Sequence, residues 1–182
     1  MDRKMLVKTS KRLSLILRHH PESVGLTLDP AGWAEVEALL AALGGRVSRS
    51  ELDAVVAGND KQRFAFDETG TRIRASQGHT VPVDLGYAEA EPPAVLFHGT
   101  HPGALDAVLR TGLAPMTRHD VHLSADVDTA RRVGARRGRP VVLEVDAAGM
   151  RAAGARFRVS ANGVWLTEAV PPEFLRVIGS SD

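Results

Sequence analysis

Residues 15–29, LILRHHPESVGLTLD, contain the break in pattern that decides how the first part of the chain folds. Apolar residues repeat at the spacing of one helix face up to this break, which predicts an amphipathic helix: Leu13, Ile16 and Leu17. Arg18, His19 and His20 follow directly, and Pro21 then ends the helix because its ring removes a backbone donor. Cations stabilise the last carbonyls of a helix, so capping is one interpretation of these three residues, and an anion site is the other.

The composition bounds the class of protein. A chain of 182 residues with 43% hydrophobic and 25% charged residues can form one large or two small folded domains. No apolar run is long enough to cross a membrane, and residues 1–12 lack the apolar core of a signal peptide. The absence of cysteine excludes disulfides, a thiolate nucleophile and cysteine-ligated metal, so we expect a cytoplasmic protein. A net charge of +1 argues against a surface that coats nucleic acid broadly.

Residues 1–85 are predicted to form two or three helices followed by a hairpin. Residues 29–43 start with turn residues and continue with a helical apolar face, Val36, Leu39, Leu40 and Leu43. SRSE at 48–51 has the spacing of a capping box and begins a further helix. RFAF (63–66) and TRIRA (71–75) flank a turn and predict two strands, which place Arg72 and Arg74 on one face. Helices followed by such a wing are similar to winged-helix modules at the level of fold alone.

Residues 84–94, DLGYAEAEPPA, show no periodicity and mark the predicted domain boundary. We therefore expect a domain at 1–85, a linker at 86–93 and a domain at 94–182. Strand and helix patterns fill the last of these. The predicted strands are AVLFH, VHLS, PVVLEVD, GVWLTE and FLRVI, and the predicted helices are PGALDAVLRTG and DVDTARRVGARRG. These elements predict a mixed α/β or α+β fold, and α+β is the expected class for the whole chain.

Seven histidines lie next to predicted element ends, at positions 19, 20, 79, 98, 101, 119 and 122. They predict a cleft to which several loops contribute, although chance placement accounts for the pattern about as well. His-x-x-His occurs at 98–101 and 119–122, but no further ligand follows at zinc spacing and the neighbouring arginines repel a cation. We expect no metal site.

Three arginines from separate segments, Arg18, Arg74 and Arg118, each lie close to a histidine, and converging guanidinium groups are suited to phosphate oxygens. The five arginines between positions 131 and 139 form a second candidate, but they spread around a helix and favour a solvated face. The chain has neither a Rossmann fingerprint nor a P-loop. FHGT (97–100) predicts a strand that runs into a turn, where the glycine admits a ligand to the backbone.

Five ordered blocks make the chain resemble the RNA 2′-phosphotransferase family from about residue 6 to 177: LSLILRHHPESVGLTLDPAGW, RIRASQGH, LFHGT, GLAPMTRHDVHLS and ANGVWLTEAVPPEFL. The resemblance implies an N-terminal winged-helix-like lobe that binds RNA. It also implies a C-terminal lobe with the ADP-ribosyltransferase fold, which binds NAD⁺ without a Rossmann motif. The expected partners are NAD⁺ as co-substrate and RNA or tRNA that carries a 2′-phosphate. We expect a monomer that needs no metal and no membrane.

The reaction that the resemblance implies transfers an internal 2′-phosphate, left at a tRNA splice junction, to NAD⁺. The phosphate attacks C1″ of the nicotinamide ribose and expels nicotinamide. The ribose 2″-hydroxyl then attacks the phosphorus, which gives ADP-ribose 1″,2″-cyclic phosphate and an RNA 2′-hydroxyl.

The resemblance also assigns residues to roles. The expected catalytic residues are Arg18, His19, Arg74 and Arg118, with one of the arginines at 131–139 as the alternative for the fourth. The expected NAD⁺-binding residues are His98, Gly99, Thr100, His122 and Ser124. Gln77 and His79 are expected to bind the substrate. Two positions depart from the family pattern, which has histidine where this chain has Asp120 and serine where it has Thr80.

Two other functions fit the sequence. The first is an ADP-ribosyltransferase that modifies nucleic-acid ends or proteins, and it would leave a lasting ADP-ribose adduct on its acceptor. The second is a winged-helix nucleic-acid-binding protein that senses NAD⁺ without turnover, against which the near-neutral charge argues.

Overall fold

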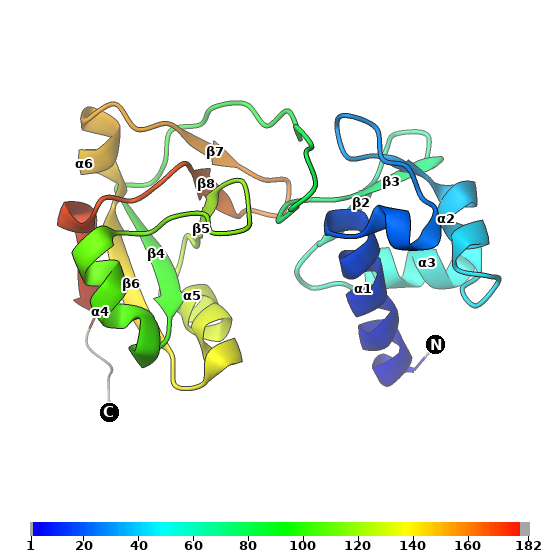
Figure 1. Ribbon diagram of the computed structural model, residues 1–182, viewed down its shortest axis with the longest axis horizontal. Helices are drawn as coiled ribbons and strands as arrows, with labels where there is room; N and C mark the ends of the chain where they lie inside the picture. The colour runs from blue at the N-terminus through cyan, green and yellow to red at the C-terminus, as the bar shows by residue number, and fades with distance from the viewer. Residues whose placement is uncertain (1, 179–182) are drawn as a thin grey trace. The chain divides into compact units, whose positions relative to one another are not determined.

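A computed structural model describes residues 2–178 of the chain. The described residues form two compact units, which divide between Gly86 and Tyr87. Both units combine α-helices with small antiparallel sheets, as Figure 1 shows for each. This confirms the predicted α+β class.

The first unit has helices packed on one small sheet (Figure 1). Its helices are α1 (Arg3–Arg18), the 3₁₀ turn η1 (Pro21–Val24), α2 (Val36–Ala42) and α3 (Arg49–Ala57). Its strands are β1 (Ala34–Glu35), β2 (Phe64–Phe66) and β3 (Arg72–Ala75). The strand order is β1-β3-β2, with both neighbours antiparallel to β3. Leucines of α1, α2 and α3 pack with Ile73 and Phe64 in a single core beneath the sheet.

Local sequence signals explain how the helices begin and end. The Asp2 side chain caps the start of α1, and the backbone of His19 closes its end by donating to the Leu15 carbonyl. Pro21 then starts η1, as its fixed φ favours. Ser48 and Glu51 form a full capping box at the start of α3. The helix ending before Pro21, the capping box and the hairpin of β2 with β3 are therefore confirmed.

The helix expected within residues 29–43 is shorter than the apolar pattern suggests, because α2 begins only at Val36. The preceding residues, Ala34 and Glu35, form β1 and pair with β3 instead of extending the helix. Asp29 holds the turn before them, since its Oδ1 accepts hydrogen bonds from the amides of Ala31 and Trp33.

The second unit contains two three-stranded antiparallel sheets. One has the order β4-β6-β9 and consists of Val95–Thr100, Val141–Asp146 and Leu175–Ile178. The other has the order β5-β8-β7 and consists of Val121–Leu123, Trp165–Thr167 and Phe157–Val159. The helices are α4 (Pro102–Thr111), α5 (Val127–Gly134) and α6 (Ala147–Ala152), with 3₁₀ turns η2 (Ala135–Arg137) and η3 (Pro172–Phe174). The sequence pattern predicted neither α6 nor β7, which are too short to show a period.

Apolar residues from both sheets of the second unit meet in one core. Leu96 and Val145 of the first sheet belong to the same buried cluster as Leu123 and Phe157 of the second. The backbones of Phe97 and Ser124 also join the sheets, through reciprocal hydrogen bonds of 2.9 and 2.7 Å. The ends of β4 and β5, where the candidate NAD⁺-binding residues lie, are therefore held in register.

Candidate functional site

The C-terminal end of α1 is anchored to the segment that follows β3. The amides of Thr80 and Val81 both donate to the carbonyl of Arg18, at 2.9 and 3.4 Å. The Thr80 hydroxyl is hydrogen-bonded to Nδ1 of His19 at 3.0 Å. The Nε and Nη2 atoms of Arg18 are buried, so its guanidinium does not extend into bulk solvent. The segment that follows β3 thus holds both the backbone carbonyl of Arg18 and the imidazole of His19.

Arg74 extends from β3 and is held by an aromatic face and two backbone carbonyls. Its guanidinium lies 4.4 Å from the centre of the Trp33 ring. Its Nη1 donates to the carbonyls of Ala31 and Leu85, at 3.1 and 3.2 Å. Trp33 is half-buried and also contacts Arg72 at 5.6 Å, so it supports guanidinium groups in addition to filling space. Its supporting role is not visible in the sequence, because no spacing rule pairs it with residue 74.

His79 lies against the same turn as Arg74. Its side chain is only 3% exposed. Gly32 has a φ of +82°, and a Cβ there would lie 3.4 Å from Nε2 of His79. The structure thus connects the end of α1, which contains Arg18, with the segment at 76–85, which contains His79. Arg74 of β3 and His79 both lie against the turn at 29–33. Gln77 is half-buried within the segment at 76–85.

In the second unit, hydrogen bonding fixes the tautomer of His98. Its Nδ1 lies 3.1 Å from the carbonyl of His122, and a carbonyl only accepts, so Nδ1 carries the proton. Burial lowers the pKa of His98 below its ordinary value, although the bond to the His122 carbonyl opposes this. A neutral imidazole protonated at Nδ1 offers Nε2 as a hydrogen-bond acceptor.

His122 is itself a partner of Arg118. Nη1 of Arg118 lies 3.0 Å from Nδ1 of His122, and guanidinium only donates, so this ring nitrogen accepts. Partial desolvation lowers the pKa of Arg118, and the positive charges of Arg136 and Arg137 lower it further. Arginine stays protonated near neutral pH even so. The guanidinium groups of Arg118, Arg136 and Arg137 therefore share one region. Arg136 and Arg137 belong to the segment at 131–139, which the sequence offered as the alternative to Arg118 for the fourth catalytic arginine.

His98, Gly99 and Thr100 all lie within β4, so the expected turn at 97–100 is wrong. The glycine has a packing reason: a Cβ at residue 99 would clash with the carbonyl oxygen of Ala130 in α5. Close approach of the helix, which the sequence does not reveal, accounts for Gly99 without a ligand. Thr100 is 8% exposed, and the Ser124 backbone pairs with Phe97.

Asp120, one of the two departures from the family pattern, forms an ion pair within the second unit. Its carboxylate accepts a hydrogen bond from Nη2 of Arg158 in β7 at 3.0 Å. The side chain of Asp120 is only 17% exposed, whereas that of Arg158 is 41% exposed, so the carboxylate is the more buried partner of this ion pair. The carboxylate is therefore engaged by a neighbouring strand, which limits its repulsion of a phosphate.

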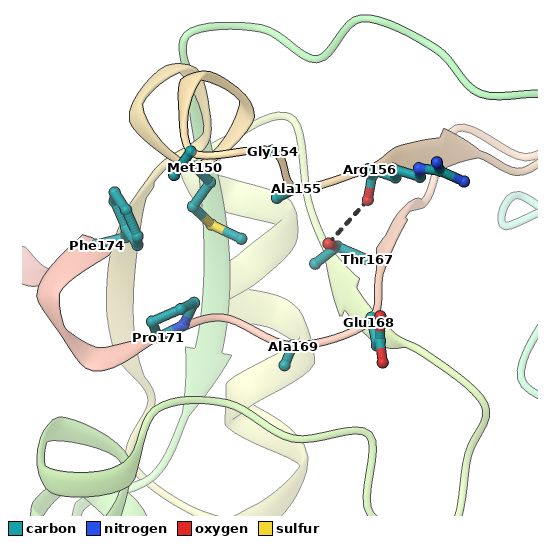
Figure 2. A pocket seen from close by; sticks show the side chains of 10 residues that line it. Met150, Gly154, Ala155, Arg156, Thr167, Glu168, Ala169, Pro171 and Phe174 are labelled. Carbon is teal, nitrogen blue, oxygen red and sulfur yellow. Dashed lines mark hydrogen bonds between the residues drawn. The ribbon is translucent and has the colours of Figure 1, made fainter.

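A cavity of about 510 Å³ lies in the second unit, where the chain enters β7 and leaves β8 (Figure 2). Phe174, Met150 and Pro171 form its apolar wall, and Arg156 and Glu168 lie on the opposite side (Figure 2). None of the residues expected to bind NAD⁺ or RNA lines it. Among residues 2–178 we find no group of three or more potential ligands arranged for a metal, and no helix long and apolar enough to cross a membrane.

The fold and the candidate site thus define a class of protein: an α+β protein whose guanidinium and imidazole groups are suited to bind phosphate oxygens. Comparison with known proteins then shows that the chain belongs to the RNA 2′-phosphotransferase, Tpt1 / KptA family, whose model matches residues 4–169. This confirms the family that the five sequence blocks indicated.

Similar proteins span the whole chain. It is 58% identical to a probable RNA 2′-phosphotransferase from Streptomyces griseus over 98% of this chain and 100% of that protein. A probable RNA 2′-phosphotransferase from Streptomyces coelicolor is 59% identical over 97% of each chain. One from Pseudomonas aeruginosa is 54% identical over 97% of this chain and 99% of its own length. The roles of individual residues, and the joint use of groups from both units, stay predictions.

Proposed function

We propose that this chain transfers an internal RNA 2′-phosphate to NAD⁺, as an enzyme of the RNA 2′-phosphotransferase family. A phosphate oxygen of the RNA forms a bond to C1″ of the nicotinamide ribose, and the bond to nicotinamide breaks. The ribose 2″-oxygen then forms a bond to phosphorus, and the bond to the RNA 2′-oxygen breaks. The 2′-oxygen gains a proton, and ADP-ribose 1″,2″-cyclic phosphate leaves.

The observation that carries this proposal is the anchored pair Arg18 and His19 in a chain of this family. Negative charge accumulates on the phosphate oxygens during the second step, and fixed cationic donors stabilise it. Arg18 is suited to this because its carbonyl is held by Thr80 and Val81 and its guanidinium is partly buried. His19 is suited to move the proton to the departing 2′-oxygen, because an imidazole titrates near neutral pH.

Arg74 supplies a further fixed guanidinium, since Trp33 and the carbonyls of Ala31 and Leu85 hold it. Arg118 is the fourth member of the proposed set, with Arg136 as its alternative. The first unit is the proposed RNA-binding lobe of the winged-helix type, and Gln77 and His79 contact the RNA.

The second unit is the proposed NAD⁺-binding lobe, with the ADP-ribosyltransferase fold. His98, Gly99, Thr100, His122 and Ser124 contact the dinucleotide. The neutral state of His98 suits a ribose hydroxyl, which donates to the free Nε2 lone pair while Nδ1 stays bound to the His122 carbonyl. The enzyme works as a cytoplasmic monomer without a metal.

The test is to incubate the protein with an RNA oligonucleotide that carries one internal 2′-phosphate, with and without NAD⁺. We expect loss of the 2′-phosphate only with NAD⁺, with one nicotinamide released for each phosphate transferred. Mass spectrometry should detect ADP-ribose 1″,2″-cyclic phosphate. Phosphate loss without NAD⁺ would contradict the proposal, as would a lasting ADP-ribose adduct on the RNA. Tight binding of both ligands without any turnover would indicate the NAD⁺-sensing alternative.

A further inference from the structure

Positive charge is concentrated in one short segment of the second unit. Residues 131–139, RRVGARRGR, contain five arginines and no carboxylate, although the whole chain has a net charge of only +1. The segment covers the end of α5, the turn η2 and the residues leading into β6. This density of guanidinium groups is a local feature rather than a property of the composition.

The five arginines divide into two groups by their partners. Arg131 lies 3.5 Å from Asp128, and Arg132 donates to the Thr129 hydroxyl at 3.0 Å, so contacts on α5 engage both. The other three follow α5 and form what we call the η2 arginine patch: Arg136, Arg137 and Arg139. All three are exposed, and among residues 2–178 no carboxylate lies within 4 Å of any of them.

The η2 arginine patch adjoins Arg118. Desolvation lowers the pKa of Arg118, and the positive charges of Arg136 and Arg137 lower it further, so these two guanidinium groups lie within electrostatic reach of Arg118. Like charges held together without counterions raise the energy of the free protein, and a bound polyanion lowers it. The proposed reaction needs only one guanidinium from this region for the transferred phosphate, so the patch contains more cationic groups than that phosphate requires.

We propose that the η2 arginine patch binds phosphodiester groups of the RNA backbone that flank the 2′-phosphate. This inference rests on the proposed function, because the RNA is the substrate of that reaction. Arginine suits the role because its planar group donates to two phosphate oxygens at once. No aromatic residue lies between positions 131 and 139, so binding depends on backbone charge and not on base stacking.

The first experiment measures RNA binding without turnover. A fluorescent single-stranded RNA that lacks a 2′-phosphate is titrated with protein at several salt concentrations, and anisotropy gives Kd. The test protein carries Arg137→Gln and Arg139→Gln. Arg136 is left unchanged, because it is the proposed alternative to Arg118 as the fourth catalytic guanidinium. For the wild type we expect the logarithm of the association constant, 1/Kd, to fall linearly with the logarithm of the salt concentration. For the double variant we expect this slope to be shallower by about 1.4, which is about 0.7 for each arginine removed.

The matched control is Arg110→Gln with Arg151→Gln, which removes two exposed arginines from α4 and α6 of the same unit. Figure 1 shows α5 and α6 at opposite ends of this unit. The control protein should keep the wild-type slope. Equal slopes for wild type and the test variant would overturn the inference, and so would an equal loss of slope in the control.

The second experiment compares substrates of different length. We expect the test variant to raise KM for a long 2′-phosphorylated RNA several-fold more than KM for a dinucleotide with the same phosphate. A raised KM for NAD⁺ with unchanged RNA binding would instead assign the patch to the pyrophosphate and overturn the inference. Patch-dependent RNA binding without phosphate transfer would reject the proposed function alone. Normal transfer of the 2′-phosphate, together with a salt dependence of RNA binding that is the same in the wild type and the test variant, would reject only this inference.

Discussion

Thr80 is placed to orient His19, through one hydrogen bond to the imidazole and through its amide to the Arg18 carbonyl. Thr80→Ser keeps the hydroxyl and should retain kcat, whereas Thr80→Val removes it and should lower kcat. One neutral hydrogen bond contributes about 0.5–1.5 kcal/mol, which corresponds to roughly a two- to tenfold decrease. Steady-state kinetics measures kcat and KM for both variants. A loss in Thr80→Ser as large as in Thr80→Val would show that the hydroxyl does not position His19.

Arg118 and Arg136 are both candidates for the fourth guanidinium, and their two variants separate them. We expect Arg118→Ala to slow the second step about 10²- to 10³-fold, because one fixed donor to a developing oxyanion is lost. Nicotinamide release should decrease less, so RNA joined to ADP-ribose should accumulate. Rapid quench with mass spectrometry follows this intermediate. Normal turnover by Arg118→Ala together with an inactive Arg136→Ala would move the assignment to Arg136.

His98 makes the stability of the second unit depend on pH. Its folded-state pKa is lowered by burial, so below the ordinary value of about 6.5 the unfolded chain binds a proton that the folded chain does not. Stability should therefore fall as the pH drops below about 6.5, with a slope of at most about 1.4 kcal/mol per pH unit. Urea unfolding at pH 7.5 and 5.5 should show a larger loss for the wild type than for His98→Asn. An NMR titration that gives His98 a pKa of 6.5 or higher would contradict this.

At the scale of elements, close packing of β4 on α5 depends on Gly99. The added methyl in Gly99→Ala meets the Ala130 carbonyl, which cannot move without bending the helix. Such overpacking typically costs about 1–3 kcal/mol, so denaturant unfolding should detect a clear loss. Gly103→Ala is the control, because its new methyl meets only the His101 side chain, which can rotate. A stable Gly99→Ala protein would mean that α5 shifts easily.

Elements with a strong local signal were predictable, and those set by tertiary pairing were not. The apolar face ending at Leu17, the capping box at Ser48 and the alternation in β3 each depend on neighbours in sequence. By contrast, Ala34 joins a strand only because β3 lies beside it. The extension of β4 through Thr100 depends likewise on pairing with β6.

The same distinction applies to the candidate site. Arg18, His19 and Arg74 stand next to recognisable breaks, so the sequence was sufficient to select them. The contact of Trp33 with Arg74 and that of Thr80 with His19 join residues 41 and 61 positions apart, which only the fold brings together. Pattern therefore identifies chemical groups, while the groups that orient them require the structure.

At the scale of the whole molecule, each unit has its own core, and the two buried clusters share no residue. The chain has two tryptophans, Trp33 in the first unit and Trp165 in the second, so each unit has its own fluorescent reporter. Trp165→Phe leaves a reporter for the first unit, and Trp33→Phe leaves one for the second. Ligand binding can therefore be assigned to a unit within the full-length chain.

If the second unit binds NAD⁺, the ligand should stabilise that unit and raise its unfolding temperature. At a concentration 100-fold above Kd the stabilisation is about 2.7 kcal/mol, and each kcal/mol raises the Tm of a domain this size by about 4–8 °C. Thermal unfolding followed by Trp165 in the Trp33→Phe protein should therefore shift upward with NAD⁺. The transition followed by Trp33 in the Trp165→Phe protein should shift less, and nicotinamide alone should move neither. A larger shift for Trp33 than for Trp165 would place the dinucleotide in the first unit and overturn the assignment of His98 and His122.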